Sequence, residues 1–422
     1  MTHQSLLMEK QLVLRALAAG KAPEAQHEQL FVGRSAELAM FERDLDVIEG
    51  GGASLRIMVG DPGSGKTMLQ HALGRRARQR RFVTMNADLS PDRLFHGNGG
   101  EGRALLEEAV MRMRTLGADE ATGLGSVVGR FTNDCGEEAA NASRHTRDLI
   151  RERLHPLHTQ PGGADFARVI EAYAVAPDFS PRAESARRWL CGGYTTISEA
   201  RDALGISSIV KDQDFWSMIK LCARFTQIAD RPGLVLFIDE ARVLCDLSNS
   251  HARALNLELL LSMLNDVFQD RAHGIGLYIS VTPPFVTQWN GLAKHDGLKS
   301  CFGQKPASSA DSLIDAVLIQ IADLDDAELI ELLTKVNTFI SECHPDARSL
   351  PTEAFEPFLE SCRQRIGEHG RQLPRNVVQG FIQFQNRLAS NPTVAWNELL
   401  PRQSTSLESP PMNLDGYAHR QM

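Results

Sequence analysis

The sequence predicts an α/β fold in which helices flank a parallel sheet, with a mostly helical insertion and a small helical domain at the C-terminal end. Three observations support this prediction. Four short apolar runs of the kind buried in parallel sheets alternate with segments of helical periodicity. A polar stretch at residues 87–230 separates the second run from the third, and it is far longer than the roughly 30 residues of a simple βαβ unit. From residue 324 onward the pattern is purely helical.

The expected elements follow in order along the chain. The four predicted strands are residues 55–59, 82–85, 234–238 and 276–281. A leucine-rich helix lies within residues 1–28, and a helix over residues 35–48 is expected to begin with Ser35 as its N-cap and Glu37 in its first turn. The insertion is predicted to contain helices at 101–113 and 144–154 and loops at 123–129 and 160–163.

The helices near the C-terminal end have recognisable starts. Asp325 followed by Glu328 is a helix N-terminal signature, Thr352 is expected to cap a second helix, and Pro374 is expected to open a third at its first position. The expected division is a helical segment at 1–28, a core at 29–322 including the insertion at 87–230, a helical domain at 323–400 and a mobile tail at 401–422.

The composition indicates an ordinary soluble protein. The 422 residues are 42% hydrophobic and 23% charged, and the net charge of −8 gives no global basic signature for nucleic acid. No window approaches the ~18 apolar residues of a membrane span, and no signal-peptide pattern is seen. Seven scattered cysteines without a C-x-x-C pair indicate reduced thiols in a cytoplasm. Cys222 and Cys245 are expected in the core, and His155 and His158 on the surface rather than on a metal.

One octapeptide fits the phosphate-binding loop pattern G-x-x-x-x-G-K-[ST] at every fixed position: Gly60-Asp61-Pro62-Gly63-Ser64-Gly65-Lys66-Thr67. It follows the first predicted strand and precedes a helical pattern over 67–80, which is the context that the motif requires. Glycines let backbone N–H groups turn toward phosphate oxygens. Lys66 supplies positive charge for the β- and γ-phosphates, and Thr67 offers its hydroxyl to Mg²⁺. The loop therefore predicts a site for ATP with Mg²⁺.

Further candidate groups follow the third and fourth strands. Asp239 is expected to hold Mg²⁺, and Glu240 to orient and activate the attacking water. The alternative, two solvated acids at a strand end, is disfavoured by the phosphate loop. Thr282 ends the fourth strand, at the edge of the sheet where a hydroxyl can position water beside the γ-phosphate. The alternative is a turn-forming threonine before Pro283.

Several basic residues invite a functional interpretation. Arg375 lies in the first turn of the helix opened by Pro374, where its charge opposes the helix dipole. We interpret it as a phosphate contact across the domain gap, with an indifferent surface arginine as the alternative. The helix after the phosphate loop ends in Arg75, Arg76, Arg78, Arg80 and Arg81. Compensation of the helix dipole is favoured there over contact with nucleic acid. Arg271, Lys294 and Lys299 are candidates for a trans-acting cation, and none stands out.

Together these residues resemble an AAA+ ATPase of the origin-recognition/Cdc6-related branch and, more narrowly, the ATP-binding proteins of bacteriophage-exclusion (BREX) systems, the BrxD-like group. The resemblance rests on the residues above and on Phe31-Val32-Gly33-Arg34 with Glu37-Leu38. It also includes Leu14-Arg15, Gly20, Pro23, residues 188–192, 199–201 and 204–206, and the stretch 234–285. One departure is Leu298-Lys299-Ser300, where the resemblance leads us to expect an arginine; lysine lacks its bidentate fork.

The resemblance implies a nucleotide pocket shaped partly by Phe31, Val32 and Gly33, and action beside a helicase-like or methylation-associated partner in antiviral defence. We therefore expect an ATPase that uses Mg-ATP to switch or remodel a partner complex, with ATP between the core and a helical lid. Direct DNA binding and assembly into a homo-oligomer remain open, and no membrane is expected. The alternatives are a slowly hydrolysing signalling switch, and a DNA or protein adaptor (a loader) without motor activity, in which the insertion does the recognising.

Overall fold

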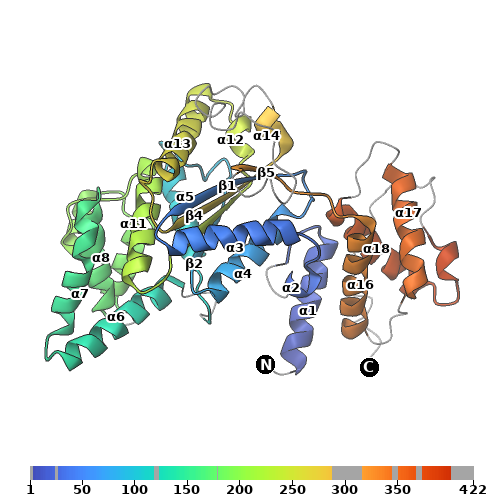
Figure 1. Cartoon of the computed structure of the whole chain (residues 1–422), viewed down its shortest axis with the longest axis horizontal. Helices are drawn as coiled ribbons and strands as arrows, with labels where there is room; N and C mark the ends of the chain where they lie inside the picture. Colours follow the sequence, from blue (N-terminus) through green and yellow to red (C-terminus); the bar gives the residue numbers. More distant parts are fainter. Residues whose placement is uncertain are drawn as a thin grey trace. The chain divides into compact units, whose positions relative to one another are not determined.

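The computed structural model describes residues 3–23, 27–117, 123–177, 179–287, 316–344, 350–366 and 373–400. These fall into two compact units (Figure 1). The first unit is Gly33–Asp323, and the second combines Met1–Val32 with Leu324–Met422. The expected tail at 401–422 lies outside the described residues, as do Lys294, Lys299 and Cys301.

The first unit is built on a five-stranded parallel sheet with the order β2-β3-β4-β1-β5. The strands are β1 (Ala53–Val59), β2 (Val83–Asp88), β3 (Leu234–Asp239), β4 (Ile275–Val281) and β5 (Leu318–Gln320). Every residue of β3 and β4 is buried, as expected for parallel strands covered on both faces. The α/β prediction is therefore confirmed, and the short edge strand β5 is an addition that the sequence analysis missed.

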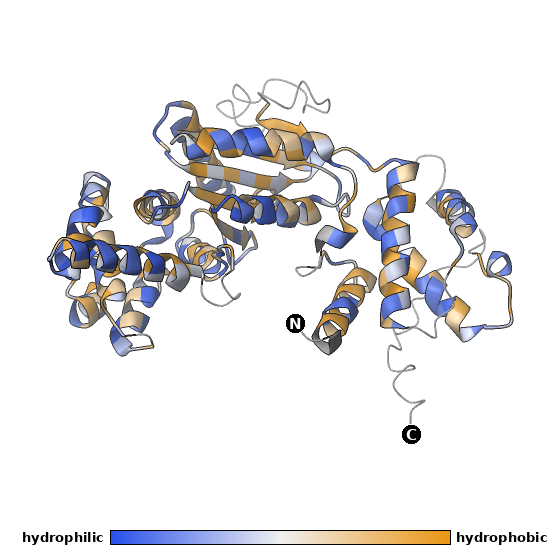
Figure 2. Ribbon diagram, turned by 60° about the horizontal axis from the view of Figure 1, so that its bottom comes forward, coloured by the Kyte–Doolittle hydropathy of each residue, from blue (hydrophilic) through white to orange (hydrophobic). Residues whose placement is uncertain are grey.

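Alternate residues of the central strands supply two apolar layers. On one face Phe237 and Tyr278 pack against Phe41 of α3 (Ser35–Glu49), with ring centroids 6.4 and 5.1 Å from the Phe41 ring. The other face joins the large core that includes the insertion, with Leu236 and Leu277 among its members. Figure 2 shows the apolar strands between helices that carry hydrophilic outer faces. Helices α3 and α4 (Lys66–Gln79) contact the first face, and α5 (Glu101–Met111), α11 (Phe215–Ile228) and α13 (Ser250–Phe268) also contact the sheet.

The insertion between β2 and β3 is helical, as predicted. After α5 it contains α6 (Gly123–Asn141), α7 (Thr146–Leu154), α8 (Gly163–Ala174), α9 (Pro181–Leu190), α10 (Ile197–Leu204) and α11, with short 3-10 turns at His155–Thr159 and Asp212–Asp214. The rings of Phe131 in α6 and Phe166 in α8 pack edge-on against Phe225 of α11. These contacts pack α6 and α8 onto α11. Trp189, singled out by the resemblance, is buried and donates a hydrogen bond to the Ser208 carbonyl at 2.9 Å. That segment is part of the insertion's core.

Two short helices follow central strands of the first unit, α12 (Val243–Asp246) after β3 and α14 (Pro283–Thr287) after β4. In the second unit α1 (His3–Ala18) packs against α16 (Asp326–Cys343) and α18 (Pro374–Ser390). Lys10 forms an ion pair with Glu342 at 2.6 Å. The unit also contains α2 (His27–Leu30), α17 (Phe355–Ile366) and 3-10 turns at Thr352–Ala354 and Trp396–Glu398. The Asp325/Glu328 capping box and Pro374 at the first turn of α18 are confirmed.

Three local predictions are wrong. Ser35 is the first helical residue rather than the N-cap, because the chain enters α3 through Gly33 and Arg34, both left-handed (φ 64° and 66°). Residues 123–129 are the start of α6 rather than a loop, because the apolar side chains among them lie on one helical face that packs into the core. Thr352 begins a 3-10 turn that leads into α17, with Pro351 as the capping position.

The six described cysteines are free and buried, and burial raises the pKa of the Cys222 thiol to about 12. The rings of His155 and His158 lie 5.2 Å apart, and no group of three or more His, Cys, Asp or Glu side chains suited to a metal occurs within the described ranges. A search of the same ranges finds no helix both long and apolar enough to span a membrane.

Candidate nucleotide-binding site

The phosphate loop joins the end of β1 to the start of α4, as predicted. Gly63 and Gly65 are left-handed, with φ of 95° and 94°, and Gly65 is the N-cap of α4. Side chains are strained in that conformation, so both positions require glycine. A Cβ at Gly60 would lie 2.6 Å from the Ser64 Oγ. The three glycines therefore allow the tight turn that brings backbone N–H groups to the helix N-terminus, where anions bind.

Two side chains of the loop, Lys66 and Ser64, are the next candidates for a phosphate contact. Lys66 Nζ donates hydrogen bonds to the carbonyls of Gly60 and Asp61, at 2.8 and 3.0 Å. Ser64 Oγ is buried and has no hydrogen-bond partner within the described residues. Because a buried hydroxyl without a partner costs about 1–3 kcal/mol, such groups mark strain or a missing ligand.

Arg34 holds the phosphate loop through a hydrogen bond to one of its backbone carbonyls, a contact that the sequence analysis did not predict. Its Nη2 donates to the Ser64 carbonyl at 2.9 Å, and its Nη1 donates to the carbonyl of Ala322, beyond β5. It also pairs with Glu37 at 3.5 Å, and both side chains are almost fully buried. A guanidinium can serve two carbonyls at once because its donors form a rigid fork.

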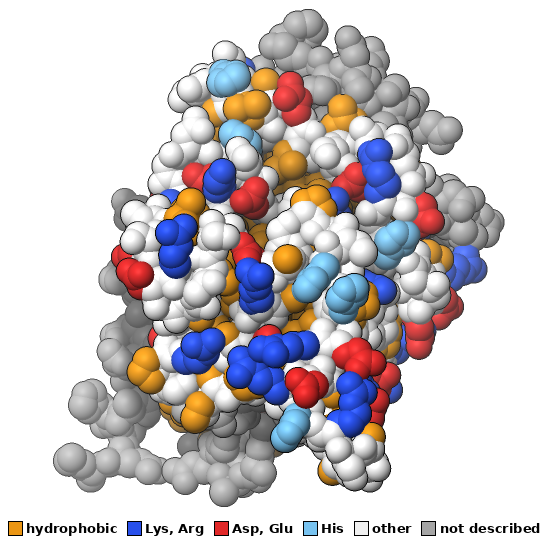
Figure 3. All heavy atoms as spheres, turned by 90° about the vertical axis from the view of Figure 1, so that its left-hand side faces the viewer, with side chains coloured by type: hydrophobic (Ala, Val, Ile, Leu, Met, Phe, Trp, Pro, Cys, Tyr) orange, Lys and Arg blue, Asp and Glu red, His pale blue; other side chains and the backbone are white. Residues whose placement is uncertain are grey.

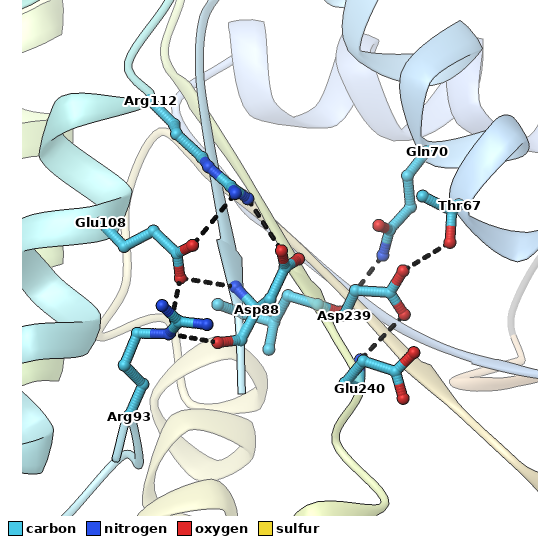
Figure 4. A network of polar contacts seen from close by, with 9 residues as sticks. Thr67, Gln70, Asp88, Arg93, Glu108, Arg112, Asp239 and Glu240 are labelled. Carbon is cyan, nitrogen blue, oxygen red and sulfur yellow. Dashed lines mark hydrogen bonds and ion pairs between the residues drawn. The ribbon is translucent and has the colours of Figure 1, made fainter. Parts of the chain in front are cut away.

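The two acidic residues after the β3 apolar run lie beside the loop. Thr67 Oγ1 donates to Asp239 Oδ2 at 2.6 Å, although the two residues are 172 positions apart. The other oxygen, Oδ1, accepts from the Glu240 amide at 2.8 Å. The structure thus brings together Thr67, Asp239 and Glu240, three of the residues predicted to act together (Figure 4).

Gln70 fixes the neighbouring strands in place. From the first turns of α4 its Nε2 donates to the Ile238 carbonyl at 3.2 Å and to Ser280 Oγ at 2.8 Å. Gln70 and Ser280 are 4% and 1% exposed. A polar residue on the apolar face of the helix that follows the loop was the available sequence signal for this contact.

Glu240 is exposed and adopts a left-handed backbone with φ of 56°. For a residue other than glycine this conformation costs roughly 1–3 kcal/mol and persists only where the surroundings enforce it. Backbone hydrogen bonds on both sides enforce it: Leu89 N donates to the Asp239 carbonyl at 3.0 Å, and Val243 N donates to the Glu240 carbonyl at 3.1 Å. Strain held in place next to a phosphate loop suggests a functional role.

Thr282 follows β4 at the same edge of the sheet. Its carbonyl accepts from the Phe285 amide at 2.9 Å, so Thr282 begins a turn that contains Pro283 and Pro284. Its hydroxyl is nevertheless buried without a partner among the described residues, like that of Ser64. The turn-forming and water-positioning interpretations are therefore compatible.

The remaining candidates are more dispersed. Gly33 belongs to the first unit, whereas Phe31, Val32 and Arg375 belong to the second. The Phe31 carbonyl accepts from Lys335 of α16 at 2.8 Å, and Val32 is buried. Arg375 is exposed on the first turn of α18. Arg271 pairs with Asp266 at 2.9 Å.

The arginines at the end of α4 are engaged within the fold. Arg76 and Arg80 pair with Glu42 of α3, and Arg80 also pairs with Asp46 at 2.8 Å and Glu49 at 2.5 Å. Arg81 pairs with Asp230 at 2.9 Å. These contacts favour the structural interpretation of the arginine run over a nucleic-acid contact.

The donor set fits a magnesium nucleotide. The Thr67 hydroxyl and the Asp239 carboxylate are adjacent oxygen ligands of the kind that Mg²⁺ prefers. Lys66, the loop amides and the orphaned Ser64 hydroxyl supply hydrogen-bond donors of the kind that phosphate oxygens accept. Nothing in this set calls for a softer metal.

A five-stranded parallel sheet with a phosphate-loop motif after β1 and an acidic pair at the end of β3 defines the P-loop NTPase fold. A family model described as "BREX system ATP-binding protein BrxC/D" matches residues 8–404. The chain therefore belongs to the BrxC/D family of ATP-binding proteins of BREX phage-defence systems, which confirms the resemblance noted in the sequence. A search of curated proteins finds no match.

Proposed function

We propose that this protein hydrolyses ATP with Mg²⁺ and uses the cycle to switch or remodel a partner complex in BREX phage defence. The observation that carries the proposal is the 2.6 Å hydrogen bond from Thr67 to Asp239, since it joins the phosphate loop to the acidic pair. The family supports ATP binding in this defence system. Hydrolysis is our inference from the acidic pair and its strained backbone.

Each side chain has a chemical role in this proposal. Lys66 and the loop amides bind the β- and γ-phosphates, and Thr67 and Asp239 would hold the metal. Bound Mg²⁺ would neutralise charge on the phosphate oxygens. Glu240 orients a water and accepts its proton as the water oxygen bonds to the γ-phosphorus and ADP leaves. In this proposal the Thr282 hydroxyl would hold that water.

Two substitutions test the site. Glu240→Gln should retain ATP binding and lower turnover on the order of 10²–10⁴-fold, because the amide cannot accept the proton. Lys66→Ala should weaken ATP binding at least about tenfold, or ~1.4 kcal/mol. Calorimetry measures binding and phosphate release measures turnover.

Arg144→Gln, which removes an exposed ion pair with Glu152 on the insertion, is the control and should change neither quantity. Normal turnover in Glu240→Gln would remove Glu240 as the base. Unchanged affinity in Lys66→Ala would count against the ATP site itself.

The turnover rate also separates a remodelling ATPase from a slow nucleotide switch. Fast turnover that a partner or DNA stimulates supports remodelling, whereas a slow and indifferent rate supports the switch. Figure 3 shows the insertion side of the molecule, where basic side chains are interspersed with acidic ones. Within the insertion, Arg147 and Arg151 both pair with Glu171, at 2.6 and 2.9 Å. This mixed surface favours a protein partner over non-specific binding of a nucleic-acid backbone.

Sizing the purified protein with and without ATP and DNA tests assembly. A shift with ATP alone supports a homo-oligomer, and a shift only with DNA supports a direct DNA contact. If neither ligand changes the size, both proposals for assembly are contradicted.

A further inference from the structure

Four charged residues form a cluster at the end of β2, beside the acidic pair (Figure 4). Glu108 of α5 accepts a hydrogen bond from the Asp88 amide at 2.9 Å. It also forms ion pairs with Arg93 Nε and with Arg112 Nη2, each at 3.1 Å. Arg112 Nη1 also pairs with the Asp88 carboxylate at 2.9 Å, and Arg93 Nε donates to the Asp88 carbonyl at 3.0 Å. Every polar group of Asp88 is therefore held by the cluster.

Glu108 is the centre of this cluster. Its side chain is 12% exposed, whereas those of Arg93, Arg112 and Asp88 are 37–41% exposed. The exposed pairs alone are weak because water screens them. Glu108 differs, since a nearly buried carboxylate with three donors is fixed in position by charge-assisted hydrogen bonds.

The cluster is connected to Glu240 through the backbone. Asp88 is the register partner of Asp239 on the adjacent strand β3. The next residue, Leu89, donates its amide to the Asp239 carbonyl at 3.0 Å. That carbonyl belongs to the peptide bond that leads into Glu240, whose left-handed backbone depends on such restraints.

We propose that Glu108 is a positioning residue for Glu240: it fixes the end of β2, and Leu89 in turn fixes the peptide that sets the direction of the Glu240 side chain. The inference rests on the proposed function, in which Glu240 is the catalytic base. It assigns a role in hydrolysis to α5, the first helix of the insertion. The effect is expected on the chemical step, because the partners of Glu108 described above, Asp88, Arg93 and Arg112, lie outside the phosphate loop.

Glu108→Gln tests this assignment on the full chain. The amide keeps the shape of the side chain, but it loses the charge and turns one acceptor into a donor that faces arginine donors. We expect kcat to fall on the order of tenfold, with the ATP dissociation constant near that of the wild type and a lower melting temperature, because arginine donors lose their charged acceptor. Glu152→Gln, which breaks an exposed pair with Arg144 in the same insertion, is the matched control and should leave kcat unchanged.

A double-mutant cycle identifies the residue through which Glu108 acts. If it acts through Glu240, then Glu108→Gln should cause no further loss in residual turnover when Glu240→Gln is already present. Equal losses in both backgrounds, unchanged kcat in Glu108→Gln, or a parallel loss of ATP affinity would each overturn the proposal. Should Glu108→Gln fail to fold, the half-exposed Arg112→Gln gives the same readout with a smaller expected loss.

The two hypotheses fail in different ways. Full turnover in Glu240→Gln alone contradicts the proposed function and removes the object that Glu108 would position. A normal rate in Glu108→Gln together with an inactive Glu240→Gln contradicts only the present inference.

Discussion

At Thr282, a contribution to stability and a role in turnover can be tested separately. Its buried hydroxyl has no hydrogen-bond partner in the described part of the chain, at the edge of the sheet that carries Asp239 and Glu240. A purely structural threonine would gain nothing from an unsatisfied hydroxyl, since valine has nearly the same shape. The position therefore allows the two interpretations of Thr282 to be separated.

Thr282→Val should raise the free energy of unfolding by about 1–3 kcal/mol, because it removes an unsatisfied buried polar group. The same variant should lower turnover if the hydroxyl holds the attacking water. Denaturant unfolding and phosphate release measure the two effects. Thr282→Ser, which keeps the hydroxyl, is the control for turnover. A valine variant that is both more stable and fully active would assign Thr282 to the turn alone.

For single residues, the sequence predicts which residues belong to the candidate site better than it predicts what their side chains contact. The motifs identify Lys66, Thr67, Asp239 and Glu240 because glycine spacing and an apolar run before two acids leave few other interpretations. They do not reveal the contacts that Arg34 and Gln70 make with backbone carbonyls of distant segments. Carbonyls occur at every residue, so no sequence pattern indicates which of them a side chain will meet.

The helix α6 begins with residues 123–129, which the sequence analysis predicted as a loop. Glycines at the start of α6 weaken the helical pattern, since glycine lowers helix propensity. The structure gives one of them a packing reason: a Cβ on Gly123 would lie 1.7 Å from the Met113 carbonyl oxygen, whereas one on Gly129 would meet nothing within 4 Å. At Gly123, tertiary packing requires glycine despite its low helix propensity. At Gly129 a Cβ would meet nothing within 4 Å, so the low helix propensity of glycine is simply unfavourable there.

The two glycines therefore make a matched pair within one helix. Gly123→Ala should lower the free energy of unfolding by roughly 1–3 kcal/mol, because the backbone must shift to admit the methyl group. Gly129→Ala should raise it by up to about 1 kcal/mol through helix propensity. Denaturant unfolding of both variants checks the signs. A similar change in both would mean that propensity alone governs α6.

The strands show the same limit of prediction. Short apolar runs predicted β1 to β4, and β5 is the strand of the described sheet that was missed. A strand of three residues offers too few positions for a periodic signal, and β5 is defined mainly by its pairing with β1. Tertiary pairing supplies information that the local sequence lacks.

For the whole molecule, the chain connects its two units twice, at residues 32–33 and 323–324. Arg34 lies beside the first connection and donates to the carbonyl of Ala322, beside the second, while its other nitrogen holds the phosphate loop. Within the first unit, Arg34 therefore links the phosphate loop to the chain beside both connections. This arrangement is suited to a protein in which the nucleotide influences the helical unit, as the proposed lid requires.

Arg375 provides the decisive test of that lid, because it belongs to the unit that lacks the phosphate loop. It is exposed in the first turn of α18, and Arg387 is exposed in the last turn of the same helix. If Arg375 contacts a phosphate, Arg375→Ala should lower turnover on the order of 10²-fold, as the loss of a preorganised cation does elsewhere. The free energy of unfolding of this variant should stay unchanged or rise by up to ~1 kcal/mol, since a charge opposing the helix dipole is removed.

Arg387→Ala is the matched control. It should leave turnover normal and slightly lower the free energy of unfolding. Equal turnover in the two variants would leave Arg375 as an ordinary surface residue and would remove the main support for a phosphate-sensing lid.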